Sequence, residues 1–139
     1  MEQRAIFADP TFRMNGEAAM TQRTPEDLEK LLQHSIDCWN NRDRDAFMEA
    51  YRKLAPGNLT IEYVGKQSGD GWAILDNMWE TTNAIVHIEV VKKIVNGDEV
   101  ACHNINKMPS KNMTIHTIEL FKFDGDDCHI RYFIRPEPA

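Results

Sequence analysis

The chain has 139 residues, of which 42% are hydrophobic and 27% are charged, and its formal net charge is -6. This length fits one domain that buries its own core without a metal or disulfides, and this composition excludes a disordered protein. The negative charge, with lysines and arginines scattered along the chain, disfavours a nucleic-acid partner.

Cysteines and hydropathy predict the compartment. Cys38, Cys102 and Cys128 are odd in number and show no CxxC spacing. We expect free, buried thiols, which fit a reducing compartment. No apolar run approaches the ~20 residues of a membrane helix, and the N-terminus lacks the charged-then-apolar order of a signal peptide. The expected location is therefore cytoplasmic, without a membrane partner.

Residues 1–23 show no sustained hydrophobic period, and Pro10 and Gly16 interrupt them. We interpret them as an N-terminal arm that can pack on the domain or on a partner subunit. The folded domain is then predicted over residues 24–139, because a helical pattern begins at Thr24.

Three helices are predicted from capping residues and apolar spacing. Thr24, followed by Pro25 and two acids, is typical of a helix N-terminus. The first stripe has spacings of three and four and consists of Leu28, Leu31, Leu32, Ile36 and Trp39. A second helix is predicted from the cap Asp43 to Leu54, and a third from the cap Asp70 to about Asn83.

The remaining segments predict strands and turns. Residues 59–64 are rich in β-branched and aromatic residues, and residues 66–71 read as a loop. The period falls to two after residue 84, and Asn96-Gly97 is a strong hairpin signal. The later predicted strands cover residues 84–95, 99–108, 113–123 and 128–135.

This order of elements predicts an α+β fold, because helices dominate the first half and four strands follow one another in the second. A long antiparallel sheet twists and curls. Its inner face must be covered, and the three helices with apolar stripes are the available cover. We expect the function to lie in a pocket between the sheet and the helices.

The chain resembles the nuclear transport factor 2-like superfamily, and within it the SnoaL-like polyketide cyclases and ketosteroid isomerase-like proteins. The resemblance covers about residues 24–135. The residues on which it rests are Trp39 to Asp43 (WNNRD), Phe47, Tyr51, Val95 to Ala101 (VNGDEVA) and Glu119 to Gly125 (ELFKFDG). It implies a cystatin-like cone, with three N-terminal helices packed on a curved, mostly antiparallel sheet. It also implies a homodimer through the outer sheet face.

Glu119 is the leading catalytic candidate. Period two places it on one strand face with Thr117 and Phe121, a more apolar face than the opposite one. Burial there would raise the pKa of the carboxyl and suit it to proton transfer. In SnoaL-like proteins an acid just before a Leu-Phe run tends to point into the pocket, and Glu119 matches that position. The alternative is a glutamate at the rim or in a salt bridge.

Tyr63 is the second catalytic candidate, as a donor to a developing enolate oxygen. Its neighbour Glu62 points to the opposite face, so one of the two enters the pocket. The alternatives are a core aromatic for Tyr63 and a solvated carboxylate for Glu62.

Asn104 would orient a carbonyl substrate from its own strand, or bond a neighbouring side chain. Further substrate-binding candidates are the aromatic residues Trp39, Tyr51, Trp79 and Phe121, for which core packing is the default.

Arg131 departs from the family pattern, because some SnoaL-like enzymes carry an acid on this last strand. If it faced the pocket, Arg131 would hold an anionic substrate or pair with Glu119.

His103 and His116 lie opposite the predicted pocket faces, which favours a dimer-interface or surface role. The histidines show no HxH or HExxH spacing, so no metal site is predicted.

The favoured function is a cofactor-free isomerase, cyclase or dehydratase. It would act by acid–base chemistry on a small apolar carbonyl compound, polyketide-like or terpenoid-like, with Glu119 moving the proton. The alternative is a ligand-binding or oligomerisation module of the same fold that catalyses nothing. The fold by itself does not decide between them, since it hosts isomerases, cyclases, dehydratases, hydrolases and assembly domains.

Overall fold

A computed structural model describes residues 23–135 of the chain. The predicted arm, apart from Arg23, and the last four residues lie outside the described residues. The helices are α2 (Pro25–Asn40), α3 (Arg44–Leu54) and α4 (Gly71–Thr82), and a short 3-10 turn follows at Pro109–Lys111. The strands are β1 (Leu59–Tyr63), β2 (Gln67–Asp70), β3 (His87–Asn96), β4 (Glu99–Met108), β5 (Met113–Asp124) and β6 (Asp127–Arg135).

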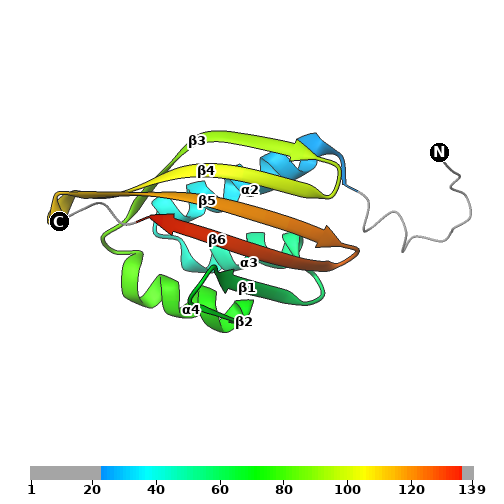
Figure 1. The fold of residues 1–139 in the computed structure, drawn as a ribbon, viewed down its shortest axis with the longest axis horizontal. Helices are drawn as coiled ribbons and strands as arrows, with labels where there is room; N and C mark the ends of the chain where they lie inside the picture. Colours follow the sequence, from blue (N-terminus) through cyan, green and yellow to red (C-terminus); the bar gives the residue numbers. More distant parts are fainter. Residues whose placement is uncertain (1–22, 136–139) are drawn as a thin grey trace, which may run out of the picture.

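The six strands form one sheet in the order β2-β1-β6-β5-β4-β3. Only β1 and β6 pair in parallel, and the other neighbours are antiparallel. Figure 1 shows the sheet from its outer side, with α2 and α3 behind it and α4 next to its β1 and β2 edge. The predicted class, three helices on a curved, mostly antiparallel sheet, is therefore confirmed.

Helix α2 begins where the sequence predicts. The Thr24 hydroxyl accepts a hydrogen bond from the Asp27 N–H at 3.0 Å, and the Asp27 carboxylate accepts one from the Thr24 N–H at 3.2 Å. This reciprocal pair satisfies two backbone donors that the first helical turn leaves free. The buried face of α2 carries Leu28, Leu32, Ser35, Cys38 and Trp39.

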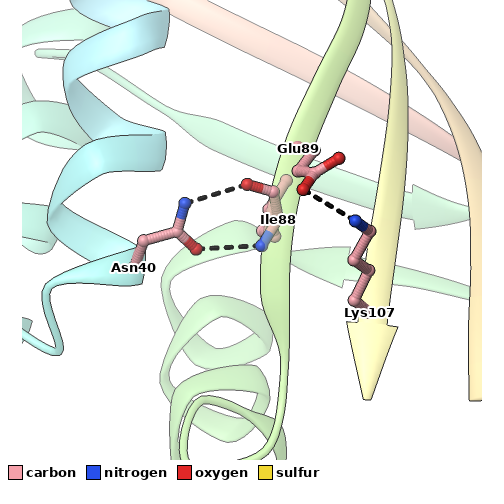
Figure 2. Close-up of polar contacts among 4 residues, drawn as sticks. All are labelled: Asn40, Ile88, Glu89 and Lys107. Carbon is pink, nitrogen blue, oxygen red and sulfur yellow. Dashed lines mark hydrogen bonds and ion pairs between the residues drawn. The ribbon is translucent and has the colours of Figure 1, made fainter. Parts of the chain in front are cut away.

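The end of α2 is fastened to the first residues of β3. The Asn40 side chain bonds both backbone groups of Ile88, donating to its carbonyl at 2.8 Å and accepting from its N–H at 2.9 Å (Figure 2). The Trp39 indole N–H donates to the Val86 carbonyl at 3.0 Å. Next to this contact, Glu89 of β3 and Lys107 of β4 form an ion pair at 2.8 Å (Figure 2). The helix end and the edge strand therefore hold Trp39 and Ile88 in fixed positions.

Two predicted boundaries are wrong. Residues 67–70 form strand β2 rather than part of a loop, pairing from Thr60 with Asp70 to Tyr63 with Gln67. All four residues of β2 are exposed, so no burial pattern in the sequence reveals the strand. Strand β3 starts at His87 rather than at residue 84, because the N–H groups of Ile85 and Val86 still donate to the Thr82 carbonyl at the end of α4.

The three cysteines are free and buried, as expected. Within residues 23–135 no helix combines the length and apolar character that crossing a bilayer requires. The same residues bring together no group of three or more His, Cys, Asp or Glu side chains suited to a metal ion. The cytoplasmic location stays a prediction.

Candidate active site

An apolar cavity of about 220 Å³ lies between the inner sheet face and the helices. All three helices and five of the strands or their flanks contribute to its wall. Among the described residues that line it, Glu119 is the one acid. Its polar lining consists of Tyr51, Tyr63, Thr82, Asn106, Thr117, Glu119 and Tyr132.

A larger hollow of about 650 Å³ lies on the surface of α3 and α4. Four of its five charged lining residues form ion pairs, Arg44 with Asp76 and Arg52 with Glu49. These side chains are largely exposed, so water screens them. The smaller apolar cavity with a carboxylate in its wall is therefore the better candidate for a site.

The Glu119 carboxylate receives two hydrogen bonds on one oxygen. Asn104 Nδ2 donates to Oε2 at 2.9 Å, and the Thr117 hydroxyl donates to the same oxygen at 3.2 Å. Glu119 is half-buried and lines the cavity. Burial raises the pKa of the carboxyl from 4.5 to about 7, although both hydrogen bonds act to lower it. Near neutral pH the group can therefore both accept and return a proton.

A chain of hydrogen bonds distinguishes the two oxygens of the Glu119 carboxylate. Asn106 Nδ2 donates to the Ile115 carbonyl and to the Thr117 hydroxyl, both at 3.1 Å. Because Thr117 accepts this bond, its own hydrogen is directed to Glu119 Oε2. Both described bonds to the carboxylate thus end on Oε2, and no hydrogen bond from a described residue ends on Oε1.

Three tyrosines surround the carboxylate. Burial raises the pKa of the Tyr63 hydroxyl, and the charge of Glu119 raises it further. The same two causes raise the pKa of Tyr51, and burial with the neighbouring Tyr51 and Glu119 raises that of Tyr132. All three phenols therefore stay protonated and act as donors. Tyr51 and Tyr132 are buried, whereas Tyr63 is half-buried and packs at a tilted angle against Tyr132 with ring centroids 5.4 Å apart.

The structure brings four predicted site residues to the cavity wall, namely Glu119, Tyr63, Tyr51 and Trp39. Asn104 is buried behind Glu119, and its Oδ1 has no hydrogen-bond partner among the described residues. Two others lie behind the wall. Trp79 packs edge-on against Trp39 at 5.2 Å, and Phe121 lies in the core beside Glu119. Their roles in substrate binding stay predictions.

Arg131 does not line the cavity, so the substrate-binding role that it would have if it faced the pocket is not supported. It lies on the outer sheet face, donates to Glu62 at 3.0 Å and stacks over the Phe133 ring at 5.2 Å. The reason is strand alternation, because Ile130 and Tyr132 are buried on the inner face and Arg131 lies between them. Glu62 is consequently an ion-paired surface carboxylate, and Tyr63 is the residue of that pair that enters the cavity.

Sequence reasoning assigned no role to Tyr132, Thr117 or Asn106. Period-two spacing placed Thr117 on the face of Glu119 and Asn106 on the face of Asn104, but it left open which face of the last strand, and so Tyr132, would line the pocket. Their function depends on which side chains meet across strands, for example Thr117 of β5 opposite Asn104 of β4. That register is a tertiary property.

No protein-family model and no curated protein matches the chain, but solved structures do. An NTF2-like protein of unknown function from Cytophaga hutchinsonii superposes with a TM-score of 0.61 and 20% identity, over 84% of this chain and 94% of that one. A candidate ketosteroid isomerase from Kribbella flavida gives 0.60 and 12%, over 91% and 88%. An M. tuberculosis LEH-like epoxide hydrolase gives 0.57 and 12%, over 76% and 80%. The chain therefore has the NTF2-like α+β cone fold. Identities this low show a shared fold but do not show a shared activity.

Proposed function

We propose that the protein is a cofactor-free acid–base enzyme that moves a proton on a small apolar carbonyl compound, as an isomerase, cyclase or dehydratase does. One observation carries the proposal. A buried carboxyl whose pKa is raised to about 7 shares an apolar cavity with three protonated phenols. Such a pairing of base and donors is what removal of a proton next to a carbonyl needs.

In the proposed step, Glu119 Oε1 takes a proton from the carbon next to the substrate carbonyl. The electron pair of the broken C–H bond moves onto the carbonyl oxygen and forms an enolate. The Tyr63 hydroxyl donates to that oxygen, because Tyr63 lines the cavity and is half-buried, whereas Tyr51 and Tyr132 are buried. Glu119 then returns the proton to carbon, at the same or at a conjugated position.

The cavity volume limits the substrate. About 220 Å³ lies below the ~300 Å³ at which drug-sized pockets begin. A monocyclic or small bicyclic terpenoid-like or polyketide-like ketone fits this space better than a four-ring compound. Cyclohexanone and cyclohexenones are therefore suitable probes, with deuterium exchange at the α-carbon in D2O, followed by NMR, as the assay.

We expect the exchange rate to rise with pH and to level off above about 7. The ionised carboxylate is the active base, so the rate should follow the fraction of Glu119 that has lost its proton, with its pKa of about 7. The measurement is kcat/KM for α-deuteration between about pH 5 and pH 9, corrected for exchange in buffer. A kcat/KM per total enzyme that is flat across this range would remove Glu119 as the base.

The alternative, a binding module without turnover, is supported by a different observation. Glu119 has no second acid beside it among the described residues of the cavity wall, and Arg131 is turned away. A binding module predicts that cyclohexenone quenches the fluorescence of Trp39 but shows no exchange above buffer. Exchange and quenching measured on the same sample separate the two functions.

We also propose that the outer sheet face forms a homodimer. Large apolar side chains are exposed there, with exposed fractions of 55% for Ile94, 42% for Ile118 and 37% for Phe133. His103 and His116 lie beside them, with their ring nitrogens 2.9 Å apart. Contiguous exposed apolar surface of this kind favours association.

The dimer predicts a clear result in sedimentation equilibrium. The wild-type chain should sediment as a dimer at micromolar concentration, and Ile118→Glu should shift it to a monomer, because an unpaired charge is costly at an apolar interface. Asn77→Glu, on the exposed side of α4, serves as the control and should remain dimeric. A monomeric wild-type chain would disprove the dimer.

A further inference from the structure

Asn106 presents a fixed hydrogen-bond acceptor to the cavity. Its Nδ2 donates to the Ile115 carbonyl and to the Thr117 hydroxyl, each at 3.1 Å. A backbone carbonyl can only accept, so a flipped amide would set two acceptors against each other. The NH2 group therefore faces β5 with both hydrogens engaged, and the orientation of Oδ1 is set.

The acceptor Oδ1 is the part of Asn106 left for a ligand. Asn106 is half-buried and lines the cavity, and no hydrogen bond from a described residue ends on its Oδ1. From this geometry we propose that Asn106 recognises a hydroxyl group of the substrate, which makes that substrate a hydroxylated ketone. The proposal rests on the proposed function for the carbonyl half of the molecule, and on the Asn106 geometry for the hydroxyl half.

The hydroxyl would be close to the reacting carbon. Asn106 Nδ2 lies 3.1 Å from Thr117 Oγ1, which lies 3.2 Å from Glu119 Oε2. One bridging hydroxyl thus separates the acceptor side chain from the base. A cyclic ketone that places its α-carbon at Glu119 can therefore reach Asn106 with a ring hydroxyl.

The direction of this hydrogen bond also bears on the reaction type. A hydroxyl that leaves as water must gain a proton as its C–O bond breaks, and Asn106 Oδ1 can supply none. By accepting the hydroxyl hydrogen, Asn106 makes that group a poorer leaving group. The recognised hydroxyl is therefore retained in the product, which favours isomerisation of a hydroxy ketone over its dehydration at that position.

The test compares cyclohexanone with its 2-, 3- and 4-hydroxy derivatives. We measure the Kd of each by quenching of tryptophan fluorescence, and kcat/KM for α-deuteration by NMR. At least one hydroxy ketone should bind the wild-type protein roughly tenfold more tightly than cyclohexanone, about the value of one hydrogen bond. Asn106→Leu should abolish this preference, and Asn106→Val, which suits a strand better and also has no acceptor, is a second variant in case the leucine variant misfolds.

Thr117→Val separates recognition of the hydroxyl from positioning of the base. It removes the bond to Glu119 but leaves Asn106 anchored on the Ile115 carbonyl. The preference for the hydroxy ketone should survive in this variant, while the pH profile of exchange shifts upward, because a bond that lowers the pKa of Glu119 is lost. Asn77→Leu, on the surface of α4, is the matched control for an asparagine lost elsewhere.

The outcomes distinguish the two proposals. A preference that disappears in Asn106→Leu and Asn106→Val and persists in Thr117→Val supports hydroxyl recognition. This holds even if no ketone shows exchange, in which case the proposed catalysis alone fails. Equal binding of cyclohexanone and all three hydroxy ketones overturns the recognition by Asn106. A preference that persists in both Asn106 variants overturns it as well.

Discussion

Replacing Glu119 by glutamine is expected to slow α-deuteration of a bound ketone by about 10²–10⁴-fold, the usual contribution of a positioned base. The amide has the shape of the carboxyl but cannot take up a proton at neutral pH. Its carbonyl oxygen can still accept from Asn104 and Thr117 as Oε2 does now. The cavity should therefore keep its form, and the Kd for the ketone should change by only a few-fold.

The matched control is Glu80→Gln, an exposed glutamate on α4 that lies outside the cavity wall. It removes the same charge from the chain and should leave exchange at the wild-type rate. NMR-monitored exchange and fluorescence quenching are measured on all three proteins. If Glu119→Gln exchanges protons as fast as Glu80→Gln does, the proton is moved by some other group.

Local patterns in the sequence predicted the parts of the fold that depend on neighbouring residues. Thr24 and Asp27 predicted the start of α2 because a capping box needs only residues three apart. Period two correctly placed Glu119 with Thr117 and Phe121 on the inner face, since alternation is a property of one strand. Likewise, Asn96-Gly97 predicted the β3–β4 turn, where Gly97 has a φ of 64° that glycine adopts without strain.

Features that depend on contacts between distant residues were not predictable in this way. The site works through Asn106, Thr117 and Asn104, and their hydrogen bonds exist only because β4 and β5 pair in one register. A shift of that register by one residue would turn each of them to the outer face. The position of Arg131 was left open for a related reason. Strand β6 pairs in parallel with β1, and the ion-pair partner of Arg131 on β1, Glu62, is 69 residues away in the sequence.

The same Glu119→Gln change is expected to stabilise the protein at alkaline pH, in the opposite direction to its effect on catalysis. The carboxyl titrates near 4.5 in the unfolded chain and near 7 in the folded protein. At pH values below 4.5 both states hold the proton, so burial of the carboxyl has no charge-related cost. As the pH rises from 4.5 to 7 the unfolded chain releases its proton first, and the free energy of unfolding falls.

Above pH 7 this loss is complete and amounts to roughly 2–3 kcal/mol, allowing for water that reaches the cavity wall. Glutamine carries no charge to bury, so the variant escapes the loss. Urea unfolding between about pH 4 and pH 8.5 should show the stability of Glu119→Gln, relative to that of Glu80→Gln, rising by that amount through the interval and then remaining constant. Two stability curves that stay parallel across the interval would mean that Glu119 titrates alike in both states. The raised pKa, which makes this carboxyl a base at neutral pH, would then be lost as an argument for catalysis.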